Sequence, residues 1–336
     1  MQLVIVVKVK ETAQEDINGN TLINMPALDG IEIKYRNNLA VHKENSQVWY
    51  NDDLHKYYDK EDDSVYVSCT QLIHHYVPEY DEQWWSKYKA LERLSKDEFF
   101  KYKSQLLQTH KITNEILSNL NLTEEQLLEE QQVVLKEWED KKNESCARGQ
   151  RIHKEWEDMF YENKNEPIKQ FGIGGKIPCY KGNWELSEHG VFPEFLLSAK
   201  SKDGFLKVSG QADLIICDSG EVTIIDHKTN AKIDKKGYFN SKTKKMECLK
   251  FPLNHIPNAS FWIYTLQMSV YGYLIEHNYP NLKVKRLILN HIDHDGNQTL
   301  YDCEYLKDDV ERLLKHFKKQ QKIHEELERI KPVQIC

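Results

Sequence analysis

The stretch GQADLIICDSGEVTIIDHKTN, residues 210–230, decides the fold, because it predicts two apolar β-strands joined by a tight Ser-Gly turn at 219–220. If these two residues form the whole loop, the numbers of paired residues sum to 439. Asp213 then lies directly opposite Asp226, although the rest of both strands is apolar. The hairpin therefore predicts two facing carboxylates within a buried sheet.

Facing carboxylates on neighbouring strands destabilise a sheet unless a cation lies near them. At about 5 Å and an effective dielectric constant near 20, their repulsion is roughly 3 kcal/mol. Because strand side chains alternate between faces, Lys228 shares a face with Asp226, and His227 points away. One interpretation is a surface hairpin in which Lys228 neutralises one aspartate. The other is a metal site, since buried carboxylate pairs are retained when they are paired or bind metal.

Composition and charge bound the class of protein. With 40% hydrophobic and 29% charged residues, the chain of 336 residues has an ordinary globular composition. No apolar run approaches the roughly 18–20 residues of a membrane span. The seven cysteines are scattered without a C-x-x-C motif, which predicts reduced thiols and a cytoplasmic protein.

The net charge of −7 argues against a simple basic nucleic-acid-binding domain, but the charge is unevenly distributed. Residues 228–250 hold eight lysines against two acids, a balance of +6, whereas residues 123–145 hold eight acids against three lysines, a balance of −5. Either segment can be a solvated face. A basic segment that begins at the suspected site also suggests a track for a polyanion.

The pattern of elements predicts an α/β fold with a mixed central sheet flanked by helices, elaborated at its N-terminal side by a hairpin and helices. We expect four regions: an N-terminal extension of uncertain structure (1–50), a hairpin and mainly helical region (51–145), a core (146–310) and a charged C-terminal helix (311–336). The element boundaries expected from periodicity are helices at 123–144, 151–162, 259–277 and 306–330, strands between 170 and 226, and strands at 284–292 and 299–305.

Four further polar residues stand out against apolar or helical surroundings. His153 lies on a predicted helix, and Glu194 interrupts the apolar strand VFPEFLLS. Gln267 and Tyr271 are four residues apart on the buried face of an apolar helix. Each is compatible with a structural role: a satisfied helix histidine, an edge-strand acid, or core side chains with internal hydrogen bonds.

Taken in order, these residues resemble the RecB-like exonuclease branch of the PD-(D/E)XK nucleases. The motifs are RG-x-x-x-H ending at His153, the isolated Glu194, G-x-x-D ending at Asp213, D-x-K from Asp226 to Lys228, and Q-x-x-x-Y from Gln267 to Tyr271. The resemblance covers roughly residues 50–310, is closest to stand-alone phage or prophage members, and implies a restriction-endonuclease-like core. Two departures are Ala212, where the superfamily name has proline, and Asp226 in place of glutamate.

The resemblance implies Mg²⁺ or Mn²⁺, as one or two ions. Asp213, Asp226 and the backbone carbonyl of His227 are the expected inner ligands, with His153 and Glu194 holding a second ion or its waters. Lys228 is expected to orient the attacking water or stabilise charge on the phosphate. Relatives with an iron–sulfur cluster carry a C-terminal C-x-x-C, which this chain lacks, so we expect no cluster.

DNA, as a single strand or a duplex end, is the expected substrate, and proteins of recombination or replication are the expected partners. In the family the positions of Gln267 and Tyr271 touch the nucleic-acid backbone or brace the ligands, and the lysine-rich segment adds Lys242, Lys244 and Lys245 as phosphate contacts. We expect a metal-dependent DNA exonuclease in recombination, repair or phage DNA replication, located in the cytoplasm of the host if a phage encodes it. The alternatives are a metal-dependent endonuclease on DNA or RNA, including a cap-snatching type, and a catalytically silent nucleic-acid-binding module.

Overall fold

The computed structural model describes residues 13–15, 21–23, 45, 47–51, 54, 56–163, 167–174, 177–180, 185–241 and 243–330. The chain divides into two compact units, Met1–Ala40 and Val41–Cys336. In the first unit, β1 (Ala13–Glu15) pairs antiparallel with β2 (Thr21–Ile23). Most of the expected extension of residues 1–50 lies outside the described residues. Its last residues instead enter the main sheet, as β3 (Val48–Asn51).

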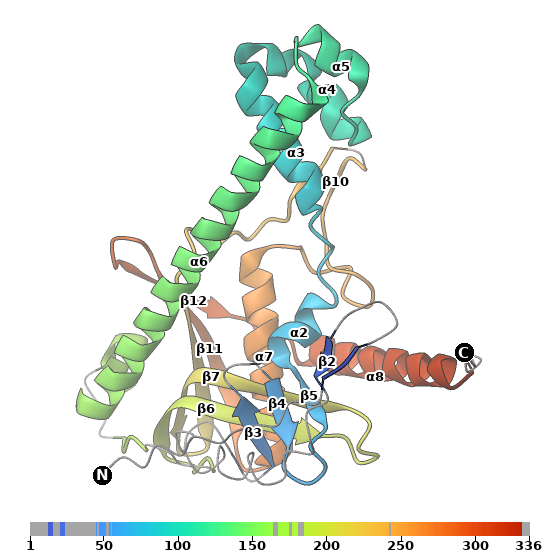
Figure 1. The fold of residues 1–336 in the computed structure, drawn as a ribbon. Coiled ribbons are helices and arrows are strands. Elements are labelled where there is room, and N and C mark those ends of the chain that lie inside the picture. Colours follow the sequence, from blue (N-terminus) through green and yellow to red (C-terminus); the bar gives the residue numbers. More distant parts are fainter. Residues whose placement is uncertain are drawn as a thin grey trace. The chain divides into compact units, whose positions relative to one another are not determined.

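A mixed sheet of eight strands forms the centre of the second unit (Figure 1), which confirms the expected fold class. The order is β12-β11-β8-β7-β5-β4-β3, and β6 also pairs with β7. The β5–β7 and β8–β11 pairs are parallel and the other pairs are antiparallel. The strands not yet bounded are β4 (Lys56–Asp59), β5 (Val65–Ser68), β6 (Gly190–Lys200), β7 (Lys207–Asp218), β8 (Glu221–Lys228), β11 (Lys283–Ile292) and β12 (Gln298–Cys303).

Helices cover both faces of this sheet. The described helices are α2 (Cys69–His74), α3 (Glu82–Ser95), α4 (Phe99–Thr109), α5 (Asn114–Asn119), α6 (Glu124–Asn163), α7 (Ser260–Asn278) and α8 (Lys307–Ile330), with 3₁₀ turns η2 (Lys96–Glu98) and η3 (Pro167–Phe171). Of these, α3, α4 and α5 lie away from the sheet (Figure 1). The C-terminal helix begins at Lys307, which confirms the helix expected at 306–330, and acidic Asp308 and Asp309 in its first turn favour that start. None of the helices that the structure describes is long and apolar enough to cross a membrane.

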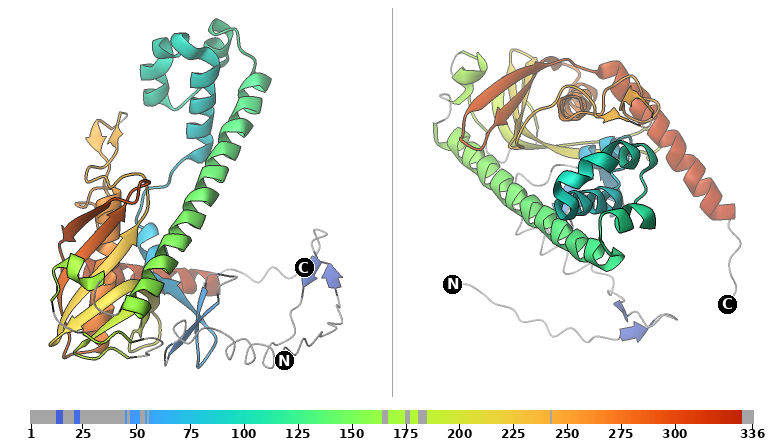
Figure 2. Two further views of the ribbon diagram at one scale, coloured as in Figure 1. Left: turned by 90° about the vertical axis from the view of Figure 1, so that its left-hand side faces the viewer. Right: turned by 90° about the horizontal axis from the view of Figure 1, so that it is seen from above.

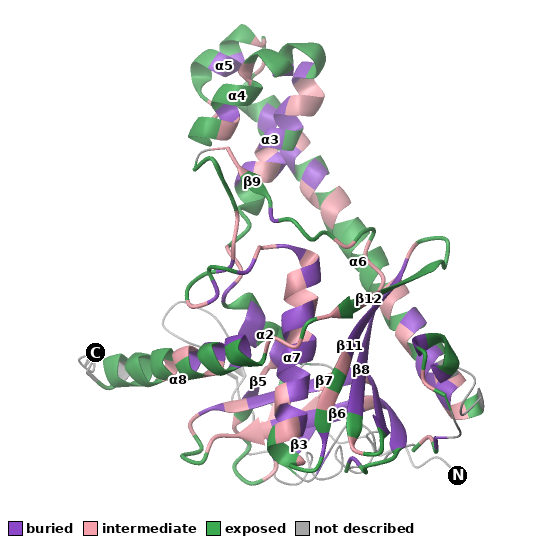
Figure 3. Cartoon of the chain, turned by 180° about the vertical axis from the view of Figure 1, so that it is seen from behind, coloured by how far each residue is buried: buried purple, intermediate pink, exposed green. Residues whose placement is uncertain are grey.

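The two faces of the sheet bury different clusters of side chains. Helices lie on both sides of the sheet in Figure 2, and Figure 3 colours most of β8 as buried. Ile215, Cys217 and Ile224 belong to the cluster that includes the buried residues of α7, α2 and α8. Leu214 and Ile225 belong to the cluster that includes the C-terminal part of α6 and η3. The alternation along β7 and β8 therefore places a helical layer on each side, as the predicted hairpin requires.

Helix α6 corrects one expectation, because the two helices predicted on either side of Gly149 are one helix of 40 residues. A glycine within a helix costs only about 1 kcal/mol. Its Cβ, if present, would lie 3.4 Å from the Thr229 Oγ1 atom, an ordinary contact. The helix gains more at its ends, where Val134 packs into the cluster formed with α3–α5 and Phe160 packs against the sheet. Residues 139–147, between these ends, are all exposed.

The helical elaboration expected before residue 145 is present as α3, α4 and α5 with the first part of α6. Its own apolar cluster includes Trp84, Leu91 and Phe99. Arg93 on α3 pairs with Glu137 on α6 at 2.5 Å, and with Glu130 at 3.3 Å. This cluster is separate from the two that cover the sheet.

One edge of β7 is shared by two strands, and this determines where the site lies. β6 pairs along nearly the whole length of β7, so it occupies one edge. On the other edge, β5 pairs only at Val208 and Ser209, and β8 pairs only from Leu214 onward. Residues 210–213 lie in the fork between the two strands, where the G-x-x-D motif stands. A Cβ on Gly210 would lie 2.7 Å from Cys69 Sγ and 2.8 Å from Tyr271 Cε1.

We therefore predict that Gly210→Ala lowers the free energy of unfolding by about 1–3 kcal/mol, because both neighbours are packed core atoms that must shift. Urea denaturation of the metal-free protein measures the change. Gly174→Ala is the matched control, since a Cβ there meets nothing within 4 Å. Equal stability of the two variants would contradict the close packing at the fork.

Candidate functional site

Three carboxylates occupy one level across three adjacent strands. The β7–β8 pairs run from Asp218–Glu221 to Leu214–Ile225, all with the sum of 439 predicted from the sequence. Asp213 and Asp226 are the next positions of this register, where the ladder ends. On the other side of β7, Pro193 pairs with Leu214 and Phe195 pairs with Ala212, which places Glu194 level with Asp213.

The backbone is distorted at this level. Glu194 has a left-handed φ of 49° inside a strand, a conformation that costs a non-glycine residue of order 1–3 kcal/mol. Ala212 and Ile215 are three residues apart, yet they belong to the same face cluster, and so do Phe192 and Phe195. The alternation thus changes phase at Glu194 and Asp213. Both carboxylates leave the pattern of the core and contact a side chain from α6.

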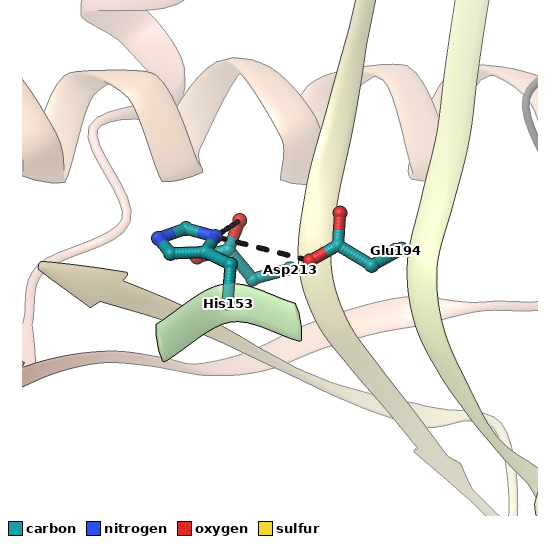
Figure 4. A group of neighbouring side chains, drawn as sticks. All are labelled: His153, Glu194 and Asp213. Atoms are coloured by element: carbon teal, nitrogen blue, oxygen red, sulfur yellow. Dashed lines mark ion pairs between the residues drawn. The ribbon is translucent and has the colours of Figure 1, made fainter. Parts of the chain in front are cut away.

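That side chain is His153, which the sequence placed on a helix (Figure 4). Its Nδ1 atom lies 3.5 Å from Asp213 Oδ1 and 3.8 Å from Glu194 Oε1. Its Nε2 atom lies 3.1 Å from the His227 carbonyl oxygen, a hydrogen bond that orients the ring. One turn further along α6, Trp156 stacks on the His227 ring at 4.6 Å between centroids. The helix therefore brings His153 over the point where the pairing of β7 with β8 ends.

The charges of these groups depend on one another. The Asp213 carboxylate raises the pKa of His153 to about 11. Burial acts against ionisation of Asp213, but the charge of His153 holds the pKa of Asp213 below its usual range. The backbone N–H of His227 also donates to Asp213 Oδ2 at 2.6 Å. In the metal-free protein, His153 thus acts as the cation that the facing carboxylates require.

Glu194 and Asp226 are the less well neutralised acids of the three. Burial raises the pKa of Glu194 to about 7, although Gln211 Nε2 donates to its Oε2 at 2.6 Å. Burial likewise raises the pKa of Asp226 to about 6. Asp226 is 1% exposed, and its Oδ1 accepts no hydrogen bond within the described part of the chain.

Lys228 lies beside Asp226, as the strand alternation predicts. Its Nζ atom is 2.6 Å from Asp226 Oδ2 and 4.9 Å from the centroid of the Tyr264 ring on α7. Burial opposes its charge, but the Asp226 and Asp213 carboxylates raise the pKa of Lys228 above its usual range. His227 contacts α6 and Lys228 contacts α7, so the two side chains occupy opposite faces.

The residues expected to bind substrate lie in two different places. Gln267 Nε2 donates to the Tyr271 hydroxyl at 2.7 Å. Burial raises the pKa of Tyr271 well above its usual value, and nearby Asp226 and Asp213 raise it further. This pair therefore adjoins the carboxylates. Lys244 and Lys245 are exposed near a small hairpin, whereas Lys242 lies outside the described residues.

Several residues of the site were not singled out from the sequence. Trp156, Gln211 and Tyr264 each contact one of the expected residues, and Gln211 stands inside the G-x-x-D motif itself. Arg148, the arginine of RG-x-x-x-H, donates from Nη1 to the Thr229 carbonyl at 2.7 Å and from Nη2 to the Asp293 carbonyl. A polar residue in an apolar strand was a usable signal for Asn290, which is buried and contacts His227 Nδ1 at 3.0 Å.

The donor set fits a divalent metal ion. Ligand atoms of His153, Glu194 and Asp213 all lie within 4.8 Å of one another. Ligands about 2.1 Å from one ion are about 3 Å apart at right angles and about 4.2 Å apart across it. Carboxylate oxygens and imidazole nitrogens both bind divalent ions, and the buried Asp226 Oδ1 accepts no hydrogen bond from the described part of the chain. The geometry therefore groups His153 and Glu194 with Asp213, where the sequence paired Asp213 with Asp226.

Comparisons with known proteins point to one family. The family model of the PD-(D/E)XK nuclease superfamily matches residues 88–336. No curated protein matches the sequence.

Two solved structures show some similarity to the chain. The crystal structure of SSO0001 is 20% identical with a TM-score of 0.24; the match covers 39% of this chain and 50% of that one, so this chain spans about half the length of that protein. The crystal structure of a "Putative exonuclease" from Eubacterium rectale is 11% identical with a TM-score of 0.32, covering 77% of this chain and 82% of that one.

We predict that Mn²⁺ or Mg²⁺ raises the melting temperature before any substrate binds, because the ion supplies the counter-charge that three carboxylates share. An ion at 100 times its dissociation constant stabilises a protein by about 2.7 kcal/mol. Asp213→Asn should abolish the shift. Asp218→Asn, which changes an exposed aspartate at the end of the same strand, should retain it. A full shift in Asp213→Asn would place the ion elsewhere.

Metal binding should also release protons. At pH 7.5 the His153 ring, with a pKa of about 11, is protonated and cannot act as a ligand until it loses that proton. About one proton should therefore leave per ion, and metal affinity should rise with pH. Titration calorimetry in two buffers of different ionisation enthalpy measures the release. Identical heats in both buffers would show that His153 does not lose its proton when the metal ion binds.

Proposed function

Because the chain belongs to the PD-(D/E)XK nuclease superfamily, whose members hydrolyse phosphodiester bonds with divalent metal ions, we propose that it is a DNA exonuclease acting in recombination, repair or phage DNA replication. The observation that supports the proposal is that Glu194, Asp213 and Asp226 lie side by side on the adjacent strands β6, β7 and β8. His153 contacts these carboxylates from α6, and Lys228 lies between them and the Tyr264 ring of α7.

His153, Glu194 and Asp213 would hold the ion, and Asp226 with the His227 carbonyl would complete its surroundings. A divalent ion bound there supplies a Lewis acid for the phosphate oxygens and lowers the pKa of water. The strained backbone at Glu194 and the hydrogen bond from His153 to His227 keep these donors in place. The protein thus provides a negatively charged site whose ligand atoms already face each other before the metal ion binds.

Lys228 is proposed to orient the attacking water or to stabilise the charge on the phosphate. Its raised pKa keeps the ammonium group protonated across the physiological range. It therefore donates hydrogen bonds to the attacking water or to the phosphate oxygens and does not accept a proton at Nζ. Asp226 directs it by the ion pair at 2.6 Å, and the face of the Tyr264 ring supports the charge from the other side.

Gln267 and Tyr271 are proposed to touch the nucleic-acid backbone or to brace the ligands. Their mutual hydrogen bond holds the Tyr271 hydroxyl beside the carboxylates, and the missing side chain of Gly210 makes room for the ring. Lys242, Lys244 and Lys245 are proposed to contact phosphates further from the site, with partner proteins of recombination or replication acting beyond them.

We predict that Lys228→Gln lowers the rate of cleavage on the order of 10²–10³-fold, as loss of a charge-stabilising donor does. The matched control is Lys207→Gln, because Lys207 forms a comparable buried pair with Asp59 at 2.8 Å on the same sheet. Both variants should lose some stability. Only Lys228→Gln should lose activity, measured as single-turnover cleavage of end-labelled DNA. Equal rates in the two variants would remove Lys228 from the chemistry.

Linear and covalently closed circular DNA of one sequence test the function itself. With Mn²⁺ or Mg²⁺ we expect nucleotides to be released from the linear form while the closed circle stays intact, because an exonuclease needs an end. The resemblance of the whole motif set to RecB-like exonucleases supports this choice. Prompt cutting of the circle, or of RNA in preference to DNA, would favour the endonuclease alternative. No cleavage of either form would favour the silent binding module.

A further inference from the structure

The segment that leaves the sheet at the end of β8 carries aromatic side chains that the proposed chemistry does not use. Residues 229–259 connect Lys228 at the end of β8 with α7, the helix that bears Gln267 and Tyr271. Both ends of this connection therefore lie at the candidate site. We call its outer part, Gly237–Glu247, the finger; it contains β9 (Phe239–Asn240) and β10 (Lys245–Met246).

The base of the finger is fixed to α7. The backbone N–H of Asp234 donates to Ser260 Oγ at 2.8 Å, and Trp262 Nε1 donates to the Lys235 carbonyl at 3.0 Å. Lys235 Nζ lies 4.5 Å from the centroid of the Phe261 ring. These contacts hold the base of the finger against the first turn of α7.

In the part of the finger that the structure describes, which leaves out residue 242, two short strands form a hairpin. A Cβ on Gly237 would lie 2.2 Å from the Glu247 carbonyl oxygen, so only glycine permits this approach of the two arms. The backbone N–H of Glu247 donates to the Tyr238 carbonyl at 2.7 Å, and Met246 pairs with Phe239. The side chains near the tip are thus presented from a defined backbone.

Large apolar side chains on the finger face solvent. Tyr238 and Phe239 are each 49% exposed and Met246 is 45% exposed. Phe239 and Met246 are cross-strand neighbours, whereas Tyr238 meets the edge of Trp85 on α3 at 5.9 Å between centroids. Several large apolar side chains exposed on one short hairpin indicate a binding surface.

Three lysines are close to these rings along the chain. Lys236, Lys244 and Lys245 are exposed, and within the described residues none of them lies within 4.0 Å of a carboxylate oxygen. Aromatic faces among unpaired lysines are typical of surfaces that bind single-stranded nucleic acid, where bases stack and phosphates contact the cations. In a duplex the faces of the bases are already covered by their neighbours, so such rings have access only to unpaired bases.

We propose that the finger is a stacking platform for unpaired bases, so that the strand to be cut reaches the site single-stranded. The proposal rests on the proposed nuclease function and names its substrate class. Tyr238 and Phe239 contact base faces, and Lys236, Lys244 and Lys245 contact the adjoining phosphates. Trp85 holds the Tyr238 ring in place from α3.

The test separates bases from phosphates by comparing a 20-nucleotide oligothymidylate with an abasic oligonucleotide of equal length. Binding is measured by fluorescence anisotropy in Ca²⁺, without reference to cleavage. Stacking contributes about 1–3 kcal/mol per base, so the wild type should prefer the base-bearing strand about tenfold or more. The Tyr238→Ala/Phe239→Ala variant should bind both strands alike. Phe100→Ala is the matched control, because Phe100 is 69% exposed with Lys103 Nζ 5.7 Å from its centroid, and it should keep the preference.

The lysines should show the opposite pattern. Lys244→Ala/Lys245→Ala should weaken binding of both oligonucleotides by the same factor, with a salt slope shallower by up to about 1.4. An unchanged Mn²⁺-induced melting shift in each variant establishes that the fold and the metal site are intact.

Three outcomes would overturn the platform: equal wild-type affinity for the two strands, retention of the preference in Tyr238→Ala/Phe239→Ala, or a duplex of the same length bound more tightly than the single strand. If the Tyr238→Ala/Phe239→Ala variant kept the base preference but lost binding to anionic lipid vesicles or to a protein, the surface would belong to that other partner. Absence of cleavage by the wild type would refute the proposed function, while the base preference would still decide the platform.

Discussion

The crowding of Glu194, Asp213 and Asp226 at one level of a buried sheet is the constraint on which the rest of the structure depends. Three carboxylates on adjacent strands are stable only where cations reach them from both sides. His153 reaches Asp213 and Glu194 from α6, and Lys228 reaches Asp226 with the Tyr264 ring behind it. Each helical layer thus has an electrostatic function in addition to covering apolar surface.

Several local irregularities follow from this constraint. The left-handed backbone at Glu194 lets its carboxylate leave the strand pattern, and the fork on β7 frees residues 210–213 from a second partner strand. Gly210 allows Tyr271 to approach this opening. The connection from Lys228 to α7 then carries the finger away from the same point. The site thus lies at this fork of the sheet, and the chain that runs from β8 to α7 carries the finger.

The sequence predicted much of this arrangement because it rests on short-range rules. A two-residue turn at 219–220 determines the β7–β8 register, which the structure confirms pair by pair from Leu214 to Asp218. Period-two alternation correctly placed His227 and Lys228 on opposite faces. The division of α6 at Gly149 was wrong, because local propensity ignores the packing at both ends of a helix. The RecB-like motif order pointed to the PD-(D/E)XK superfamily, whose model matches residues 88–336.

By itself, the sequence determined the fold class, the hairpin register and the residue types of the site, since each depends on neighbours close along the chain. Only the tertiary structure decided which acid faces which cation. His153 is 60 residues from Asp213, and their 3.5 Å contact depends on how α6 crosses the sheet. The grouping of Glu194 with His153 depends on a change in the side-chain alternation of β6 and β7, and the periodicity of the sequence does not predict that change. Such contacts arise from the packing of separate layers, and packing is a property of the whole core.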